Sequence, residues 1–263
     1  MMNYEEFANE IYKVTGIDLR CYKENQMKRR MDAFIIRHEY SSYEEYLCYI
    51  RENNDRISEL KDYITINVSE FFRDKQQWEI LRYNMVPYYE TRFKKELDKD
   101  GLRIWCSACS TGEEPYSLAM ILSEYIPLKK IHIYATDIDE KVLETAKKGE
   151  YTRKDVFKVP ADLRDKYFDK VGDDCYRICE SIKNCVKFGK QDLLHDVYYR
   201  GYHMILCRNV VIYLNREARK NIYEKMSLSL VKDGILFVGA TEQITEYRDL
   251  GFEQIKSFFY KKI

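Results

Sequence analysis

The segment LRIWCSACSTGEEPYS, from Leu102 to Ser117, constrains the fold of this chain more than any other part of its sequence. An apolar run that ends in small residues predicts a buried strand, and the Ser-Thr-Gly-Glu-Glu turn predicts a tight loop. Pro115 then stands where a helix begins, at the first helical position that its fixed φ favours. Such a junction brings backbone N–H groups to the carboxyl end of a strand, where open α/β sheets bind nucleotide-like ligands. The sequence therefore predicts an α/β fold with a ligand site at this junction.

A second apolar strand, IHIYATDID, follows about one helix later and ends in Asp137. An acid about 20 residues beyond the loop is placed to accept hydrogen bonds from ribose hydroxyls. The loop contains one glycine and two glutamates, Glu113 and Glu114, whereas phosphate-binding loops need several glycines or a Gly-Lys-Ser/Thr run. S-adenosylmethionine has a ribose, an ammonium group and a sulfonium but no phosphate, so its charge fits this loop. The alternative is that the glutamates only stabilise the first turn of a helix.

The remaining chain continues the alternation of strands and helices, which predicts a mainly parallel sheet. Further strands are expected at Cys185–Leu193, His203–Leu214 and Gly234–Glu242, and the segment FEQIKSFFYKKI is expected to form a single last strand. Helices are expected at Pro115–Tyr125 and from residue 66 to about residue 100. The rhythm breaks between Gly149 and Asn184, where a short alternating run near Tyr176 indicates a small β insertion.

Four segments in order along the chain resemble the chemotaxis receptor methyltransferases, which are protein-glutamate O-methyltransferases that use S-adenosylmethionine. These segments are NVSEFFRD at Asn67–Asp74, TGEEPYS at Thr111–Ser117, ATDID at Ala135–Asp139 and CRNVVIYL at Cys207–Leu214. The resemblance implies a Rossmann-like sheet of seven strands, the last one antiparallel. It also implies an N-terminal helical domain over residues 1–66 and a methyltransferase domain over residues 67–263, with an antiparallel β subdomain at about 150–184.

The resemblance also assigns residues to the cofactor and its product, S-adenosylhomocysteine. Glu114 is expected to pair with the methionyl ammonium, and Asp137 is expected to bind the ribose. Asp192 and Leu193 match positions that line the adenine, although the family commonly has Asn where Asp192 stands. The positions that enclose the methionyl end are matched by Asn67, Ser69, Arg73, Arg208 and Asn209.

Methyl transfer to glutamate needs alignment rather than a general base, because the acceptor carboxylate is already ionised at pH 7. Arg73 is predicted to hold that carboxylate through two parallel N–H bonds, which only a guanidinium offers. Tyr213 is predicted to donate one hydrogen bond beside the methyl group. The alternatives are a salt bridge from Arg73 to Asp74 or Glu70, and a core position for Tyr213 at the end of a buried strand.

The first 65 or so residues have apolar positions at helical spacing, and one helix is expected from Cys21 to about Tyr40. The stretch from Arg20 to Arg37 has a net charge of +4. In the resembling family a basic helix docks the methylation helices of receptors, and the corresponding residues here are Lys23, Arg29, Arg30 and Arg37. The alternative is an ordinary solvated helix face. The β subdomain is expected either to bind a peptide at the receptor C-terminus or to be a surface hairpin without a partner.

Composition narrows the class of protein. The chain has 263 residues with 44 Lys and Arg against 44 Asp and Glu, so its charge gives no hint of nucleic-acid binding. The start MMNYEEFANE has no signal-peptide pattern and no apolar run is long enough to span a bilayer. We therefore expect a cytoplasmic monomer that is recruited to membrane receptors. Cys106 and Cys109 form a C-x-x-C pair, but no second pair has zinc spacing, so we expect reduced thiols and no metal site.

Two other functions remain open from the sequence. A module that binds S-adenosylmethionine or S-adenosylhomocysteine only to recruit partners would not need Arg73, Asn209 and Tyr213. A methyltransferase acting on nucleic acid would favour a basic stripe with stacking aromatics. It could also carry an Asn-Pro-Pro-Tyr-type element, whereas the corresponding segment here is RNVVIY.

Overall fold

The computed structural model describes residues 2–263 and divides the chain into two compact units. The helical unit consists of the chain up to Ile66 together with Val210–Ile222. The sheet unit consists of Asn67–Asn209 and Tyr223–Ile263. The segment Val210–Ile222, which the sequence had placed in the second domain, thus belongs to the helical unit. None of the described helices combines the length and the apolar character that a bilayer-spanning helix requires.

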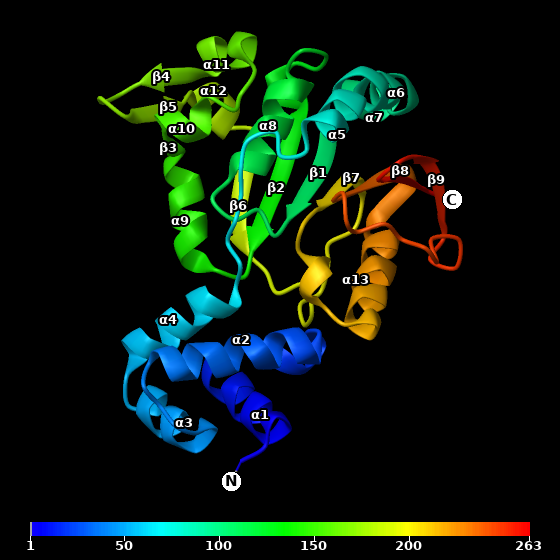
Figure 1. Cartoon of the computed structure of the whole chain (residues 1–263). Coiled ribbons are helices and arrows are strands. Elements are labelled where there is room, and N and C mark those ends of the chain that lie inside the picture. Colours follow the sequence, from blue (N-terminus) through cyan, green and yellow to red (C-terminus); the bar gives the residue numbers. More distant parts are fainter. Residues whose placement is uncertain (1) are drawn as a thin grey trace. The chain divides into compact units, whose positions relative to one another are not determined.

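The helical unit is built on short helices (Figure 1). Many apolar residues of this unit are buried. Its elements are α1 (Tyr4–Thr15), the 3₁₀ turn η1 (Leu19–Cys21), α2 (Glu24–Arg37), α3 (Tyr43–Arg51), α4 (Asn54–Ile64) and the 3₁₀ turn η4 (Val211–Tyr213). Met27, Met31 and Phe34 are buried on one face of α2, as their spacing predicts. The predicted start of α2 at Cys21 is wrong, because Tyr22 instead pairs with Leu214 in an isolated antiparallel bridge.

The sheet unit contains a seven-stranded sheet with the order β6-β2-β1-β7-β8-β10-β9 (Figure 1). Its strands are β1 (Leu102–Ser107), β2 (Ile131–Asp137), β6 (Val186–Lys190), β7 (Tyr202–Cys207), β8 (Leu230–Val238), β9 (Phe252–Lys256) and β10 (Phe259–Lys262). The first five of these strands pair in parallel, whereas β10 runs antiparallel to both of its neighbours. This arrangement confirms the predicted Rossmann-like sheet with an antiparallel last strand.

Three strand predictions were wrong in detail. The strand expected at Gly234–Glu242 is β8, which runs from Leu230 to Val238. The other two errors concern breaks in a predicted strand. The single last strand is a hairpin of β9 and β10, because Phe258 takes a left-handed conformation with φ of 71° and reverses the chain. The strand expected at His203–Leu214 ends at Cys207, and the chain then enters η4. Both errors arose because no glycine or proline marks the break.

Helices and connecting segments bring polar residues to the carboxyl ends of the parallel strands. The helices are α5 (Lys75–Ile80), the π-helical turn η2 (Leu81–Met85), α6 (Val86–Arg92), α7 (Lys94–Lys99), α8 (Glu113–Leu122), α9 (Glu140–Lys148) and α13 (Arg216–Ser229). Helices α8 and α9 both pack on β2 and β6. Helix α8 begins at Glu113, so Pro115 is its third residue and not the predicted first. Proline lacks a backbone N–H, but this costs nothing at the third position, because the first four N–H groups of a helix have no partner within it.

The predicted β insertion is confirmed as a three-stranded antiparallel sheet with the order β3-β5-β4 (Figure 1). Its elements are β3 (Glu150–Thr152), α10 (Arg153–Val156), α11 (Ala161–Tyr167), β4 (Phe168–Lys170), β5 (Cys175–Ile178) and α12 (Glu180–Lys183). Phe71 makes edge-to-face contacts with Tyr151 and Phe168, and the Tyr151 hydroxyl donates to the carbonyl of Thr111 at 2.8 Å. The insertion therefore buttresses both the loop after β1 and the connector.

Candidate active site

The loop after β1 is held in a tight, left-handed backbone path. Ala108 and Ser110 have φ of 57° and 48°, and Gly112 precedes α8 with φ of 95°. Left-handed non-glycine residues cost of order 1–3 kcal/mol and cluster at functional sites. The N–H of Ser110 donates to Oδ2 of Asp137 at 2.8 Å. The loop is thus tied to the end of the neighbouring strand β2.

Asp137 ends β2 and is buried. Its Oδ1 accepts the N–H of Asp139 at 3.1 Å, while its Oδ2 accepts the N–H of Ser110. Burial raises the pKa of the Asp137 carboxyl, and these backbone donors oppose the shift. Because an ionised carboxylate has about four acceptor positions, acceptor capacity remains on both oxygens for ribose hydroxyls.

Asp139 is a site residue that sequence reasoning missed. Its Oδ1 caps α9 by accepting the N–H of Lys141 at 2.9 Å, and its Oδ2 accepts from Nδ2 of Asn67 at 2.8 Å. Asn67, which was predicted at the methionyl end, therefore lies beside the end of β2. The signal was present in the ATDID segment, where a second acid follows Asp137 at the start of a helix.

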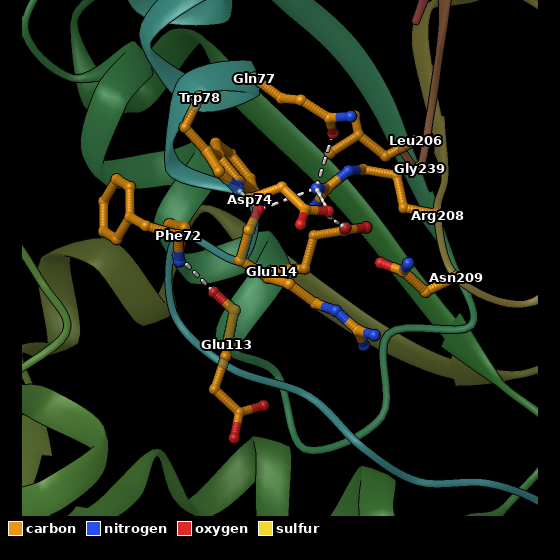
Figure 2. A network of polar contacts seen from close by, with 12 residues as sticks. Phe72, Asp74, Gln77, Trp78, Glu113, Glu114, Leu206, Arg208, Asn209 and Gly239 are labelled. Atoms are coloured by element: carbon orange, nitrogen blue, oxygen red, sulfur yellow. Dashed lines mark hydrogen bonds and ion pairs between the residues drawn. The ribbon is translucent and has the colours of Figure 1, made fainter. Parts of the chain in front are cut away.

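Arg208 follows β7 and is the centre of a buried polar network (Figure 2). Its Nη1 donates to Oε2 of Glu114 at 3.1 Å. Its Nη2 donates to the carbonyl of Arg73 at 2.8 Å, to Oε1 of Gln77 at 2.9 Å and to Oδ2 of Asp74 at 3.2 Å. The guanidinium therefore joins the first turn of α8 to the segment that carries Arg73.

The side chains of Arg208 and Glu114 are largely shielded from solvent. The Arg208 side chain is 1% exposed and its guanidinium lies 5.3 Å from the ring centroid of Trp78 and 4.7 Å from that of Phe237. Burial raises the pKa of the Glu114 carboxyl, although the charge of Arg208 opposes this shift. Only Oε2 of Glu114 accepts a hydrogen bond from the residues described in the structure. Its Oε1 is therefore left as an acceptor for the predicted ammonium.

The backbone on both sides of Arg73 is strained. Phe72 and Asp74 have φ of 53° and 62°. The N–H of Phe72 donates to Oγ of Ser117 at 3.2 Å, and Nε1 of Trp78 donates to the Arg73 carbonyl at 2.8 Å. Since non-glycine residues adopt such conformations only when neighbours enforce them, the position of Arg73 is fixed by its surroundings.

The side chain of Arg73 is less constrained than its backbone. Its Nη1 donates to the carbonyl of Val68 at 3.0 Å, and the guanidinium makes no ion pair among residues 2–263. The predicted alternative of a salt bridge to Asp74 or Glu70 is wrong. Asp74 pairs with Arg208, and Glu70 pairs with Lys158.

The two glutamates at the start of α8 have different surroundings. Both oxygens of Glu113 accept from the Thr111 hydroxyl, at 2.7 and 2.8 Å, and the Ser69 hydroxyl is a further partner. Burial raises the pKa of the Glu113 carboxyl. Glu113 thus binds its own loop and holds Ser69, whereas Glu114 faces Arg208.

Asn209 adopts a left-handed conformation with φ of 59°, and Glu242 holds it there. The carboxylate of Glu242 accepts the N–H groups of Asn209 and Gly239, the latter at 3.0 Å. A Cβ atom at Gly239 would lie 3.0 Å from the nitrogen of Asn209, so only glycine fits. Sequence reasoning missed both Glu242 and Gly239.

The predicted adenine residues lie in a turn after β6. Oδ1 of Asp192 accepts the N–H of Leu194 at 2.8 Å. The carbonyl of Leu193 accepts from the Tyr198 hydroxyl at 2.6 Å and from Nζ of Lys225 at 3.2 Å. These bonds stabilise the turn and leave both side chains half-buried.

Several buried polar atoms in this region have no hydrogen-bond partner in the described chain. They are Oγ of Ser110, Oε1 of Gln191, Nε2 of Gln77 and Nε of Arg208. Gln191 and Arg208 directly follow β6 and β7, and Ser110 lies in the loop after β1. Because unpaired buried polar groups cost about 1–3 kcal/mol each, they mark a site that suits a polar ligand. Together with Asp137 and Glu114, they fit S-adenosylmethionine.

The two C-x-x-C thiols are buried, and their burial raises the pKa values of Cys106 and Cys109 well above the ordinary value. Among residues 2–263 no three His, Cys, Asp or Glu side chains are grouped as a metal site.

Tyr213 and the predicted docking residues lie in the helical unit. Tyr213 is a half-exposed residue of η4, so its predicted alternative, a core position at the end of a strand, is wrong. Its carbonyl accepts the N–H of Lys23 at 2.9 Å. Lys23, Arg29 and Arg37 are exposed, and Arg30 is half-buried.

Comparison with known proteins identifies the family. The family model "CheR methyltransferase, all-alpha domain" matches residues 2–65, and "CheR methyltransferase, SAM binding domain" matches residues 67–259. A solved structure, a TehB-like SAM-dependent methyltransferase from Corynebacterium glutamicum, aligns with a TM-score of 0.38 and 15% identity, covering 65% of this chain and 84% of that chain.

Two relatives match over nearly their whole length. The chemotaxis protein methyltransferase of Listeria monocytogenes is 36% identical over 260 residues, which are 99% of this chain and 97% of the relative. That of Borreliella burgdorferi is 31% identical and covers 96% of this chain and 91% of the relative. The chain therefore belongs to the CheR methyltransferase family and is an S-adenosylmethionine-binding chemotaxis methyltransferase.

Proposed function

We propose that this enzyme methylates glutamate side chains on the cytoplasmic methylation helices of chemotaxis receptors, producing glutamyl methyl esters and S-adenosylhomocysteine in sensory adaptation. One observation carries the proposal: Arg208 binds the carboxylate of Glu114 and the carbonyl of Arg73 at the same time. A carboxylate suited to the cofactor ammonium is thereby fixed to the residue whose guanidinium forms no ion pair among residues 2–263. A carboxylate for the cofactor next to a guanidinium for the acceptor suits transfer of the methyl group to a carboxylate.

The residues act by alignment. Bound S-adenosylmethionine supplies a methyl group on a sulfonium, and the ionised acceptor needs no base. Arg73 orients the acceptor carboxylate through its planar fork, and the Tyr213 hydroxyl donates one hydrogen bond beside it. Fixing two reactants in a near-attack geometry is worth about 7–11 kcal/mol, so positioning alone accounts for a large acceleration.

The cofactor is held by residues from several strand ends. Asp137 binds the ribose, Glu114 binds the ammonium, and Asp192 and Leu193 line the adenine. The methionyl end is enclosed by Ser69, Arg73, Arg208 and Asn209, with Asn67 reaching the site through its bond to Asp139.

Replacing Asp137 by alanine should weaken S-adenosylmethionine binding about 10- to 100-fold, because hydrogen bonds to a charged acceptor contribute roughly 1.5–3 kcal/mol. Asp137→Asn keeps one acceptor oxygen and should lose less. Titration calorimetry measures the affinities, and thermal unfolding checks that the loop tied by Ser110 remains folded. Unchanged affinity in folded Asp137→Ala would contradict the ribose assignment.

Binding of S-adenosylmethionine should weaken as the pH falls below neutrality toward the ordinary pKa range of a glutamate. The reason is that the raised pKa of Glu114 lets this carboxyl take up a proton at a higher pH than an ordinary glutamate. Above its pKa the carboxylate pairs with the ammonium, and below it the charge is lost. Calorimetry across this range should give a flatter profile for Glu114→Gln; equal slopes in both proteins would remove Glu114 from the ammonium site.

The proposal places the enzyme in the cytoplasm as a monomer that is recruited to membrane receptors. Either edge strand of the insertion, β3 or β4, offers backbone groups to which an extended receptor C-terminal peptide can add. We expect no nucleic-acid partner and no insertion into the membrane.

A transfer assay with methyl-labelled S-adenosylmethionine tests the function. Label should enter a receptor cytoplasmic fragment and not nucleic acid. Label in nucleic acid would support a different target, and tight cofactor binding without transfer to any substrate would support a recruiting module.

A further inference from the structure

The turn after β6, which carries the predicted adenine residues Asp192 and Leu193, is acidic. Residues 191–196 read QDLLHD, so the turn holds two aspartates and no lysine or arginine. The N–H of Asp192 donates to Oδ2 of Asp196 at 2.7 Å, and the N–H of Asp196 donates to the carbonyl of Asp192 at 3.0 Å. These bonds concentrate both aspartates in one short turn.

Lys225 of α13 supplies a positive charge to this turn. Its Nζ donates to the carbonyls of Leu193 and Leu194, at 3.2 and 3.1 Å, and lies 4.3 Å from the centroid of the Tyr198 ring. An ammonium has three N–H donors, so the two carbonyls and the ring face provide a partner for each. Burial lowers the pKa of the Lys225 ammonium, although the charges of the two aspartates oppose this shift. The lysine is therefore a partly buried anchor of the turn.

Tyr198 connects the same turn to the end of β2. Its hydroxyl donates to the carbonyl of Leu193 at 2.6 Å, and its ring packs edge-to-face on Trp105 with 4.8 Å between the centroids. Nε1 of Trp105 donates to Oγ1 of Thr136 at 2.9 Å, and Thr136 directly precedes Asp137 in β2. Both aromatic side chains are buried. A packed series of contacts within the sheet unit thus joins the predicted adenine residues to the predicted ribose residue.

We propose that Lys225 and Tyr198 are positioning residues for S-adenosylmethionine. Together they hold the carbonyl of Leu193 and so fix the adenine turn relative to Asp137. The proposal rests on the proposed cofactor assignments and adds two residues that act through the turn, without touching the methyl group or the acceptor. A turn that is ordered before the cofactor arrives loses less conformational freedom on binding, so these contacts raise affinity. Because adenine lies away from the reacting sulfonium, they stabilise the ground state and the transition state equally.

The test is cofactor binding by the full-length enzyme, measured by calorimetry, which does not depend on the identity of the methyl acceptor. Lys225→Met removes the ammonium and keeps an unbranched stem, and Tyr198→Phe removes the hydroxyl and keeps the ring. Thermal unfolding checks the fold of each variant. Tyr198→Phe is the milder exchange, and it decides the outcome if Lys225→Met does not fold.

Two matched controls make the same exchanges elsewhere in the sheet unit. Lys262→Met removes another half-buried ammonium, which donates to Oγ of Ser227 at 2.7 Å. Tyr202→Phe removes the hydroxyl of a second tyrosine that lies against Trp105. Neither exchange removes a hydrogen bond to the carbonyl of Leu193.

A second ligand separates the adenine turn from the methionyl end. Methylthioadenosine has the adenine and the ribose of the cofactor but no ammonium. Lys225→Met should weaken methylthioadenosine and S-adenosylmethionine by the same factor, whereas Glu114→Gln should weaken S-adenosylmethionine alone. A general loss of structure would not give this pattern.

Lys225→Met should raise the Kd of both ligands about tenfold, and Tyr198→Phe should raise it about fivefold. The controls, and kcat for transfer to a receptor fragment at saturating cofactor, should stay within about twofold of the wild type. Equal effects of Lys225→Met and Lys262→Met, wild-type affinity in Tyr198→Phe, or weakening of S-adenosylmethionine alone would overturn the proposal. A wild type that does not bind methylthioadenosine at millimolar concentration would overturn it as well. The expected affinities without transfer to the receptor fragment would overturn the proposed function alone.

Discussion

Replacing Arg73 by lysine is expected to lower the turnover number for receptor methylation about 100-fold, because lysine keeps the charge but loses the planar fork that orients a carboxylate. S-adenosylmethionine affinity should change by less than about threefold, since Arg73 anchors Arg208 through its backbone carbonyl and not through its side chain. Single-turnover kinetics and calorimetry measure the two effects separately.

The matched control is Arg92→Lys, which makes the same exchange at an exposed ion pair with Asp233. It should leave both quantities within about twofold of the wild type, as surface pairs contribute little. Equal turnover in Arg73→Lys and the wild type would show that charge alone suffices and that Arg73 does not orient the acceptor.

Replacing Arg208 by methionine is expected to lower the free energy of unfolding by about 3 kcal/mol, because removal of one partner of a buried ion pair leaves a charge without compensation. Methionine retains the apolar stem beside Trp78 and Phe237, so the loss reports mainly on the guanidinium. Glu114, Asp74 and Gln77 all lose a hydrogen bond. Urea unfolding measures the change through the midpoint at constant slope.

The double variant Arg208→Met, Glu114→Gln serves as the control. Removing the charge of Glu114 as well should recover part of the lost stability, because no buried carboxylate is then left unpaired. Strictly additive losses would show that the two side chains do not interact. A single Arg208→Met variant as stable as the wild type would remove Arg208 from the centre of the network.

The sheet could be predicted because its strands carry strong local signals. The run from Leu102, the glycine of the loop and the acid at Asp137 follow from apolar patterning and turn chemistry alone. The hairpin of β9 and β10 could not be predicted, because its turn places Phe258 at φ of 71°, a conformation usually left to glycine. At Phe258 the tertiary structure overrides the local backbone preference of a non-glycine residue.

The site residues that directly follow strands could be predicted from the sequence. The site residues that contact partners far away in the sequence were missed. Gln77 reaches Arg208 across 131 positions of the chain, and Glu242 reaches Asn209 across 33. Neither contact has a local sequence signal. Their partners were found only through family resemblance, which gave Arg208 and Asn209 but not the residues that hold them.

The central claim is that the acceptor is a glutamate carboxylate, and the stability of the transferred methyl group tests it most directly. Receptor fragment labelled from methyl-labelled S-adenosylmethionine is treated with mild alkali, and volatile methanol is counted. A glutamyl methyl ester hydrolyses, so the account predicts that nearly all label is released as methanol. Label that stays on the receptor through this treatment would mean an N-methyl or other stable product and would contradict the assignment of Arg73 as a residue that orients a carboxylate.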